Sequence, residues 1–505
     1  MNREVDRPDL TLGVVGAGTM GQGIAQIAVL AGCDVIVHDV RPGAAETARD
    51  QIAAMLAKLV DKGRLGATER DMALARLRVA DDLAALAPCN VVVEAIVEAL
   101  GPKQELMTRL EAVVSDHCLL ATNTSSLSVT AIAAICRLPG RVAGFHFFNP
   151  VPLMKVVEVI DGLLTEPAAA EALMALARRM GHRPVRAKDT PGFIVNHAGR
   201  GFGTEALRIL GEGVAGFAAI DRVLKEAAGF RMGPFELLDL TGLDVSHPVM
   251  EAVYTQFYHE PRFRPSPITA QRLAAGLLGR KSGRGFYRYD GGTAPDPVVA
   301  VPPAWTGPVW VAPAGGGAAL AAQLDRLGTK IEAGDGPSER ALCLVAPLGE
   351  DCTGMAVRLG LDPRRTVAVD TLFGLSSHRT VMTNPATLAE VRDGAHGLMA
   401  ADGVTVTVIH DSPGLIAQRV VATIVNIACE IAQQRIATPD DIDGAVSLGL
   451  GYPFGPLAWG DALGPRNVLG VLENIQAATG DPRYRPSPWL RRRALLGLSL
   501  HTIED

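Results

Sequence analysis

The chain has 505 residues, of which 48% are hydrophobic and 20% are charged, and its formal net charge is −6. These proportions describe a globular protein of several domains and exclude a largely disordered chain. The mildly acidic balance leaves no basic footprint for DNA or RNA, so we expect no nucleic-acid partner.

Membrane and secretory signals are not expected. The uncharged run from Leu10 to Cys33 is rich in glycine, and the run from Val301 to Leu324 is interrupted by prolines, so neither predicts a membrane span. The charged first residues lack the apolar segment of a secretory signal. The 7 cysteines are scattered without a CxxC pair, which is typical of reduced thiols in a cytoplasmic protein.

Residues 10–186 alternate short apolar runs with helical patterns. Continuous apolar runs of this length predict a parallel sheet that is covered by helices on both faces. From Asp189 the pattern becomes helical, which predicts an all-α domain that ends near Tyr289. Residues 290–317 are rich in proline and glycine and are the best candidate linker.

An internal repeat relates this helical region to the end of the chain. The segment DTPGFI at 189–194 returns as DSPGLI at 411–416, and EPRFRPSP at 260–267 returns as DPRYRPSP at 481–488. The repeat indicates a duplicated helical domain. Residues 308–410, between the copies, again alternate apolar runs and helical patterns but lack GxGxxG, which predicts a small, degenerate α/β domain.

The predicted organisation therefore has five parts. They are a nucleotide-binding domain at 9–188, a helical domain at 189–290, a linker at 291–307, a small degenerate Rossmann-like domain at 308–410 and a second, degenerate helical domain at 411–500.

A glycine-rich turn follows the first apolar run and opens the first helix. It consists of Gly16, Ala17, Gly18, Thr19, Met20 and Gly21. Glycines in this context permit a tight turn and let the backbone approach a pyrophosphate at a helix N-terminus. Asp39 ends the second run, where an acid binds a ribose 2′-hydroxyl and repels a 2′-phosphate, so the pattern favours NAD over NADP.

Polar side chains end two later strands, at positions where open α/β sheets bind ligands. The cluster at 122–126 either meets a ligand or caps a helix. His146 ends another strand, and Glu158 lies within a valine run, where a carboxylate is costly unless it is paired. A His–Glu pair would form a general base, whereas the alternative is a satisfied core histidine beside an unrelated glutamate. Asn196 falls on an apolar helix face, where its amide needs partners.

In combination these motifs resemble the 3-hydroxyacyl-CoA dehydrogenase family over residues 10–290. The resemblance rests on GAGTMG, EAIVE, NTSSL, HFFNPVPLMKVVEV, DTPGFIVN, MGPFELLD and GRKSGRGFY, which occur in that order. It implies an α/β Rossmann-like N-terminal domain and an all-α, 6-phosphogluconate-dehydrogenase-like domain, followed by a second α/β segment and a duplicated all-α domain. The long plan is similar to bacterial members that oxidise 3-hydroxyadipyl-CoA in phenylacetate catabolism, or 3-hydroxybutanoyl-CoA, within the wider chemistry of fatty acid β-oxidation.

The resemblance also implies a set of catalytic residues. His146 would take the proton from the C3 hydroxyl of the substrate, and Glu158 would orient His146. Ser125 and Asn196 would hold the substrate near the reacting oxygen, and hydride would pass to NAD.

Contacts to the cofactor and to CoA follow from the same resemblance. Besides the glycine-rich turn and Asp39, the implied NAD contacts are Glu98, Lys103, Ser125, Asn149 and Lys281. Lys62 would meet the CoA phosphates, while Met55 replaces a polar CoA contact that some members have. No metal is expected.

The second half departs from the pattern. Gln418 stands where Asn196 would repeat and no His–Glu pair accompanies it, so we expect one active site per chain. The helical domain dimerises in smaller relatives, so the duplicated copy is expected to form an internal pseudo-dimer within a monomer, or the chain is a homodimer. A dehydrogenase acting on a non-CoA hydroxy acid and a non-catalytic nucleotide-binding protein remain as alternatives.

Overall fold

The computed structural model describes residues 5, 7–289 and 300–504, which form two compact units. The first unit comprises Met1–His197 and Gln434–Leu450, and the second comprises Ala198–Gln433 and Gly451–Asp505. Residues 291–299 of the predicted linker, and residues 1–4 and 6 of the predicted charged start, lie outside the described residues.

An eight-stranded sheet in the order β3-β2-β1-β4-β5-β6-β7-β8 forms the centre of the first unit. Its strands are β1 (Thr11–Val15), β2 (Asp34–His38), β3 (Leu77–Ala80), β4 (Val91–Glu94), β5 (Leu119–Thr122), β6 (Val142–Phe147), β7 (Val156–Asp161) and β8 (Arg183–Lys188). Neighbouring strands run parallel except β6 and β7, which are antiparallel. The short buried valine-rich runs form the sheet that their pattern predicts.

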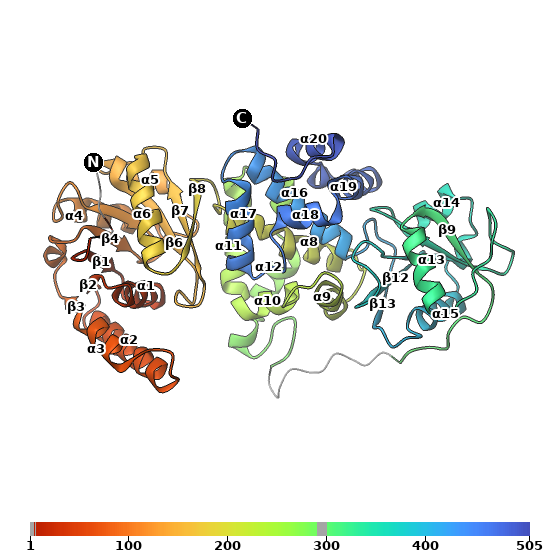
Figure 1. Cartoon of the computed structure of the whole chain (residues 1–505), viewed down its shortest axis with the longest axis horizontal. Helices are drawn as coiled ribbons and strands as arrows, with labels where there is room; N and C mark the ends of the chain where they lie inside the picture. Colours follow the sequence, from red (N-terminus) through yellow and green to blue (C-terminus); the bar gives the residue numbers. More distant parts are fainter. Residues whose placement is uncertain (1–4, 6, 290–299, 505) are drawn as a thin grey trace. The chain divides into compact units, whose positions relative to one another are not determined.

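Helices flank this sheet, and a separate apolar core lies on each of its faces (Figure 1). They are α1 (Thr19–Leu30), α2 (Ala44–Asp61), α3 (Ala67–Ala75), α4 (Leu100–Glu111), α5 (Val129–Ala133), α6 (Pro167–Arg179) and α17 (Pro439–Leu450), with the single turn α7 (Val195–Ala198) after β8. The strand order reverses between β1 and β4, and such a reversal opens a crevice at the carboxyl ends of the strands.

Helix α17 is contributed to the first unit by the second helical copy, at residues 434–450. The backbone N–H of Lys188 donates to the carbonyl of Ile436 at 2.9 Å, and the Arg183 guanidinium donates to the carbonyl of Asp440 at 3.1 Å. The sheet edge at β8 is therefore covered by a segment that lies far away in the sequence.

The second unit contains both helical copies apart from α17. Its helices from these copies are α8 (Arg200–Gly211), α9 (Phe217–Glu226), α10 (Pro234–Thr241), α11 (Leu243–Gln256), α12 (Pro267–Ala274), α16 (Ala417–Gln433), α18 (Pro456–Leu463), α19 (Pro465–Thr479) and α20 (Pro488–Leu496). Helix α16 is buried along almost its whole length and packs against α8, α18, α19 and α20 (Figure 1). Most of its residues are apolar, and its buried polar side chains Gln418, Arg419 and Asn426 have hydrogen-bond partners.

Charged side chains also connect the two helical copies. Glu205 of α8 is fully buried and accepts hydrogen bonds from Arg419 at 2.5 Å, Arg483 at 3.1 Å and Tyr484 at 2.6 Å. Burial would raise the pKa of Glu205, but the charges of Arg419 and Arg483 hold that pKa below its usual value. A buried carboxylate is tolerated when it is paired in this way.

The contact between the copies is also reciprocal. Arg262 of the first copy donates to the carbonyl of Arg485 at 2.7 Å, and Arg483 of the second copy donates to the carbonyl of Pro261 at 3.1 Å. The donors, Arg262 and Arg483, occupy equivalent positions in the repeated segments, whereas the acceptors, Arg485 and Pro261, do not. Each copy therefore donates an arginine to the backbone of the other, in a contact that is only partly symmetric.

A second sheet of five strands, in the order β13-β12-β11-β10-β9, lies between the helical copies in the sequence. Its elements are β9 (Val309–Gly315), α13 (Gly317–Arg326), β10 (Leu342–Ala346), α14 (Cys352–Arg358), β11 (Thr366–Val369), β12 (Arg379–Thr383), α15 (Ala389–Met399) and β13 (Val406–Ile409). They enclose one apolar core of their own. The Rossmann-like domain, the second α/β segment and the duplicated helical domain are thus confirmed.

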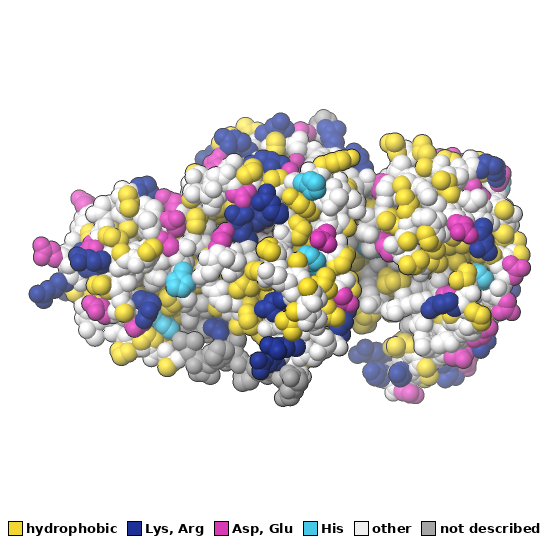
Figure 2. Space-filling model, turned by 180° about the vertical axis from the view of Figure 1, so that it is seen from behind, with side chains coloured by type: hydrophobic (Ala, Val, Ile, Leu, Met, Phe, Trp, Pro, Cys, Tyr) yellow, Lys and Arg dark blue, Asp and Glu magenta, His cyan; other side chains and the backbone are white. Residues whose placement is uncertain are grey.

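No described helix is long and apolar enough to cross a membrane. On the face drawn in Figure 2, acidic and basic side chains are interspersed over the surface.

Candidate active site

The glycine-rich turn lies between β1 and α1, at the reversal of strand order. Gly16 has φ +103°, and a Cβ there would lie 2.4 Å from the carbonyl oxygen of Ala95. A Cβ on Gly21 would lie 1.8 Å from the carbonyl oxygen of Gly16. Gly18 has open space around its Cα, which leaves its backbone accessible to a bound group. The three glycines therefore meet the requirements of a dinucleotide-binding turn.

Asp39 follows β2 and faces this turn. Its Oδ2 accepts a hydrogen bond from the backbone N–H of Ala17 at 2.8 Å, and its carboxylate also binds Arg41. Burial opposes ionisation, but the hydrogen bonds from Arg41 and Ala17 outweigh it and lower the pKa of Asp39 to about 2. Asp39 is therefore ionised at neutral pH.

A cavity of about 580 Å³ opens beside these groups, and Gly16, Gly18, Asp39, Ile96 and Arg109 are among its lining residues. It combines a free glycine backbone, an ionised carboxylate and apolar walls. These are the features that NAD requires for its pyrophosphate, its ribose and its adenine, so the residues present fit the cofactor.

His146 and Glu158 lie directly opposite each other on the antiparallel strands β6 and β7. Opposed residues in such a pair project from the same face of the sheet. His146 Nδ1 and Glu158 Oε2 are 2.6 Å apart, and the two residues are 4% and 0% exposed. Because a carboxylate only accepts hydrogen bonds, the neutral ring that faces it carries its proton on Nδ1 and leaves Nε2 as an acceptor.

The other carboxylate oxygen of Glu158 is also satisfied. Its Oε1 accepts from the backbone N–H groups of Ile194 at 2.9 Å and Val195 at 2.8 Å. These donors belong to the turn that leads into α7, where Asn196 follows directly. Glu158 therefore fixes His146 and the backbone next to Asn196 together.

Ser125 and Asn196 meet in this unit, since the Asn196 amide donates to the carbonyl of Ser125 at 3.3 Å. The backbone N–H and the hydroxyl of Ser125 donate to Oε1 of Glu98 at 2.7 and 3.1 Å. Burial would raise the pKa of Glu98, but the Lys103 charge and hydrogen bonds from the 124–126 loop hold that pKa below its usual value.

Lys103 lies under this loop. It is 1% exposed, and its Nζ is 2.6 Å from Glu94 Oε1 and 3.3 Å from Glu98 Oε2. Glu94 is fully buried at the end of β4 and also accepts from the Thr122 hydroxyl at 2.7 Å. The network joins the ends of β4 and β5 and holds Glu98 toward the serine loop.

The remaining predicted residues take separate places. Asn149 is exposed just after β6, Lys62 is exposed at the end of α2, and Met55 lies on α2 with 46% exposure. Lys281 belongs to the second unit, where its Nζ lies 2.8 Å from Asp244.

The second copy repeats the backbone geometry of this region. The backbone N–H of Phe193 donates to Thr190 at 3.0 Å, and that of Leu415 donates to Ser412 at 3.1 Å. Asp189 caps the backbone at 129–130, and Asp411 caps that at 352–353. The two segments are therefore equivalent in structure as well as in sequence.

Different side chains occupy the corresponding positions. The strand register places Asp370 at the position of His146 and Thr380 at that of Glu158. Gln418 donates to Asp370 Oδ1 at 2.9 Å. The second copy therefore has no His–Glu pair at this place in the described structure.

The sequence pattern predicts no role for Glu94, and it includes Asn123 only as part of the polar cluster at 122–126. Glu94 positions Lys103, and Asn123 accepts from the backbone N–H of Phe147 at 2.8 Å, which ties the loop after β5 to β6. An acid at the end of a valine run was the available signal for Glu94, as it was for Glu158.

Comparison with known proteins identifies the family. Residues 11–190 match the NAD-binding domain of 3-hydroxyacyl-CoA dehydrogenase, and residues 192–289 and 414–500 both match its C-terminal domain.

Individual relatives match over most of the chain. It is 40% identical over 490 residues to 3-hydroxyadipyl-CoA dehydrogenase of Escherichia coli K12, covering 96% of this chain and 98% of that protein. A crystal structure of 3-hydroxybutyryl-CoA dehydrogenase from E. coli K12 matches with TM-score 0.86 and 38% identity, covering 97% and 98% of the two chains. A probable 3-hydroxybutyryl-CoA dehydrogenase of Bacillus subtilis is 42% identical over 277 residues, covering 55% of this chain and 96% of that protein. The chain belongs to the 3-hydroxyacyl-CoA dehydrogenase family and is an NAD-dependent oxidoreductase.

Proposed function

We propose that this enzyme oxidises an (S)-3-hydroxyacyl-CoA to the 3-oxoacyl-CoA by using His146 as its general base. The observation that carries the proposal is the buried His146–Glu158 pair, whose geometry leaves Nε2 of His146 able to accept a proton. Positioned general-base catalysis contributes about 10²–10⁴-fold to rate.

In the proposed reaction, Nε2 of His146 takes the proton of the C3 hydroxyl. Glu158 keeps the proton of the neutral ring on Nδ1 and stabilises the imidazolium that forms. Ser125 and Asn196 hold the substrate near the reacting oxygen. Bound NAD supplies the hydride acceptor.

The cofactor is proposed to lie along the glycine-rich turn from Gly16 to Gly21, with Asp39 on its ribose. Glu98, Lys103, Ser125, Asn149 and Lys281 complete the proposed contacts. Lys103 is buried, so its contribution is electrostatic and structural, through Glu98.

The proposed substrate is 3-hydroxyadipyl-CoA or 3-hydroxybutanoyl-CoA, because these acyl groups appear in the names of the relatives that match most of the chain. Lys62 is proposed to meet the CoA phosphates, since it is an exposed cation at the end of α2. Phenylacetate catabolism is the proposed pathway for the dicarboxylic substrate.

The test compares two substrates in one assay. NADH absorbance is followed with acetoacetyl-CoA in the reductive direction and with 3-hydroxyadipyl-CoA and NAD⁺ in the oxidative direction. Activity on both, with a much higher kcat/KM for one, identifies the preferred acyl group. His146→Ala should abolish turnover while NADH binding stays close to wild type, and near wild-type turnover would remove His146 from the mechanism.

The two helical copies are proposed to replace the dimer contact of smaller relatives, so that the chain is a monomer with an internal pseudo-dimer. Hydrogen bonds from the equivalent arginines Arg262 and Arg483, each to the backbone of the other copy, support this proposal. Light scattering should give the mass of one chain, and a homodimer is the other outcome. A truncation that ends near residue 290 and stays monomeric and active would contradict it.

The five-part division given in the sequence analysis is also proposed, with α17 as the part of the second helical copy that packs with the first unit.

The proposed location is the cytoplasm, because all seven cysteines are buried free thiols, as is usual in reducing compartments.

A further inference from the structure

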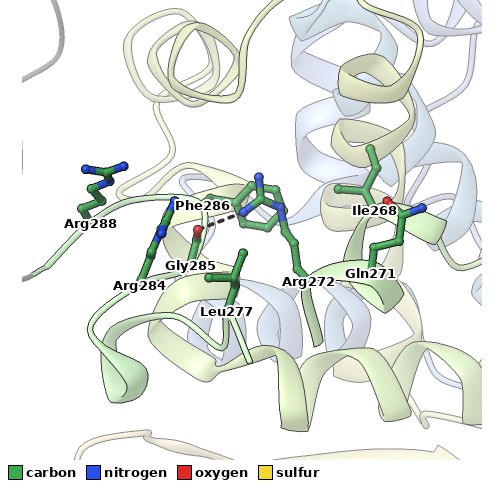
Figure 3. A pocket seen from close by; sticks show the side chains of 8 residues that line it. All are labelled: Ile268, Gln271, Arg272, Leu277, Arg284, Gly285, Phe286 and Arg288. Carbon is green, nitrogen blue, oxygen red and sulfur yellow. Dashed lines mark hydrogen bonds between the residues drawn. The ribbon is translucent and has the colours of Figure 1, made fainter. Parts of the chain in front are cut away.

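A second cavity, of about 450 Å³, lies in the first helical copy. Helix α12 contributes Gln271 and Arg272 to it, and the turn that ends this copy contributes Arg284, Phe286 and Arg288 (Figure 3). Three of the eight lining residues are arginines.

Two other cations of the surrounding GRKSGRGFYRY segment have partners outside the cavity. Lys281 forms an ion pair with Asp244, and Arg280 lies over the Tyr289 ring with 5.6 Å between its guanidinium carbon and the ring centroid. In the part of the chain that the structure describes, no carboxylate forms an ion pair with the three arginines of the cavity. Their positive charge is therefore available to a ligand.

Asp239 is a carboxylate whose charge acts on Arg272 of the cavity. It is fully buried and accepts from the backbone N–H groups of Phe286 and Tyr287, both at 2.8 Å, and from the Tyr289 hydroxyl at 3.1 Å. Burial and the charge of Arg284 lower the pKa of Arg272, while the charge of Asp239 opposes them. Asp239 thus acts on Arg272, and within the described residues no hydrogen bond or ion pair joins it to Arg284 or Arg288, so the cavity keeps a positive charge.

The turn holds Arg272 in place. Its Nη1 donates to the carbonyl of Gly285 at 2.9 Å, and its guanidinium carbon lies 4.1 Å from the centroid of the Phe286 ring. Figure 3 shows Arg284 and Arg272 on either side of Gly285. A Cβ on Gly285 would lie 2.0 Å from Asp239 Oδ1, so this turn requires glycine. The Arg272 guanidinium is therefore pre-organised, with donors left unused, and Arg284 is exposed beside it.

We propose that this cavity binds a small organic phosphomonoester. Such a group carries about −1.5 to −2 charges at pH 7 and can pair with more than one guanidinium group, whereas a monocarboxylate carries only one charge. Planar guanidinium groups bind phosphate oxygens in a bidentate manner. Leu277 and the Phe286 ring supply an apolar wall for the organic part of the ligand.

Phenyl phosphate is a suitable probe, since it has a phosphomonoester and a small apolar group. Its binding to the full-length protein is measured by isothermal titration calorimetry with NADH present at saturation, so that the nucleotide site is already filled. We expect one site per chain. Arg284→Gln should weaken binding about 10- to 100-fold, because a charge-assisted hydrogen bond is lost. Arg272→Gln should weaken it similarly.

The matched control is Arg326→Gln, which removes an exposed arginine on α13 and should leave the Kd for phenyl phosphate unchanged. Inorganic phosphate should bind more weakly than phenyl phosphate, since it makes no use of the apolar wall. Adipate, which also carries two charges, should bind more weakly than both. Absence of binding, binding that Arg284→Gln leaves intact, or tighter binding of adipate would overturn the proposal. Circular dichroism verifies that each variant is folded.

Discussion

Replacement of Glu158 by glutamine tests the proposed orientation of His146. The wild-type carboxylate faces three donors, which are the backbone N–H groups of Ile194 and Val195 at 2.9 and 2.8 Å and His146 Nδ1 at 2.6 Å. Glutamine has the same shape but only one oxygen. If that oxygen stays with the two backbone donors, the amide nitrogen faces Nδ1 and donates to it. His146 then carries its proton on Nε2, where it cannot accept another.

The expected cost follows from this change of tautomer. An analogous Asp-to-Asn exchange in a Ser-His-Asp triad lowers kcat by about 10⁴. We expect kcat/KM of Glu158→Gln to fall by about 10³-fold or more, which corresponds to about 4 kcal/mol of lost transition-state stabilisation. The affinity for NADH should change little, since Glu158 contacts the histidine and the 194–195 backbone. Steady-state reduction of acetoacetyl-CoA measures the first quantity, and fluorescence titration with NADH measures the second.

The second copy offers a matched control. Asp370→Asn neutralises a buried carboxylate at the position that corresponds to His146, and it should leave kcat/KM unchanged. A Glu158→Gln enzyme that is folded and keeps kcat/KM within about tenfold of wild type would refute the tautomer argument.

Three further outcomes are expected. Asp39→Asn should weaken NADH binding about 10- to 100-fold and reduce the discrimination against NADPH, as measured by fluorescence titration with both nucleotides. Arg419→Met leaves buried Glu205 with less compensation, so the free energy of unfolding in urea should fall by about 3 kcal/mol. Burial raises the pKa of Asp370 to about 6, above its value in the unfolded chain, so ionised Asp370 costs stability above that pH and the cost disappears as pH falls toward 4. Asp370→Asn should accordingly stabilise the protein by about 3 kcal/mol at pH 8 and have almost no effect near pH 4, whereas an equal effect at both pH values would contradict the assignment.

Local patterns were sufficient for the general plan of the molecule. Valine-rich runs, helical periodicity and the spacing of Gly16, Gly18 and Gly21 predict the first α/β domain, because period and turn geometry are properties of short segments. The repeat of DTPGFI as DSPGLI predicts the second helical copy, and family models match both copies. The sequence also predicted Asp39, because an acid at the end of the second strand is part of the same dinucleotide-binding pattern as the glycine-rich turn.

Contacts between distant segments required the tertiary structure. The sequence suggested a pair of His146 with Glu158 but left a satisfied core histidine as the alternative. The choice depends on the antiparallel pairing of β6 with β7, and the apolar runs that form these strands look alike whether they pair in parallel or antiparallel. Tertiary pairing also decided three further features. These are the contact of Lys103 with Glu98, the equivalence of Asp370 with His146, and the packing of α17 on the first unit. Each depends on register or packing across elements, where the energy comes from burial and pairing that no short segment encodes alone.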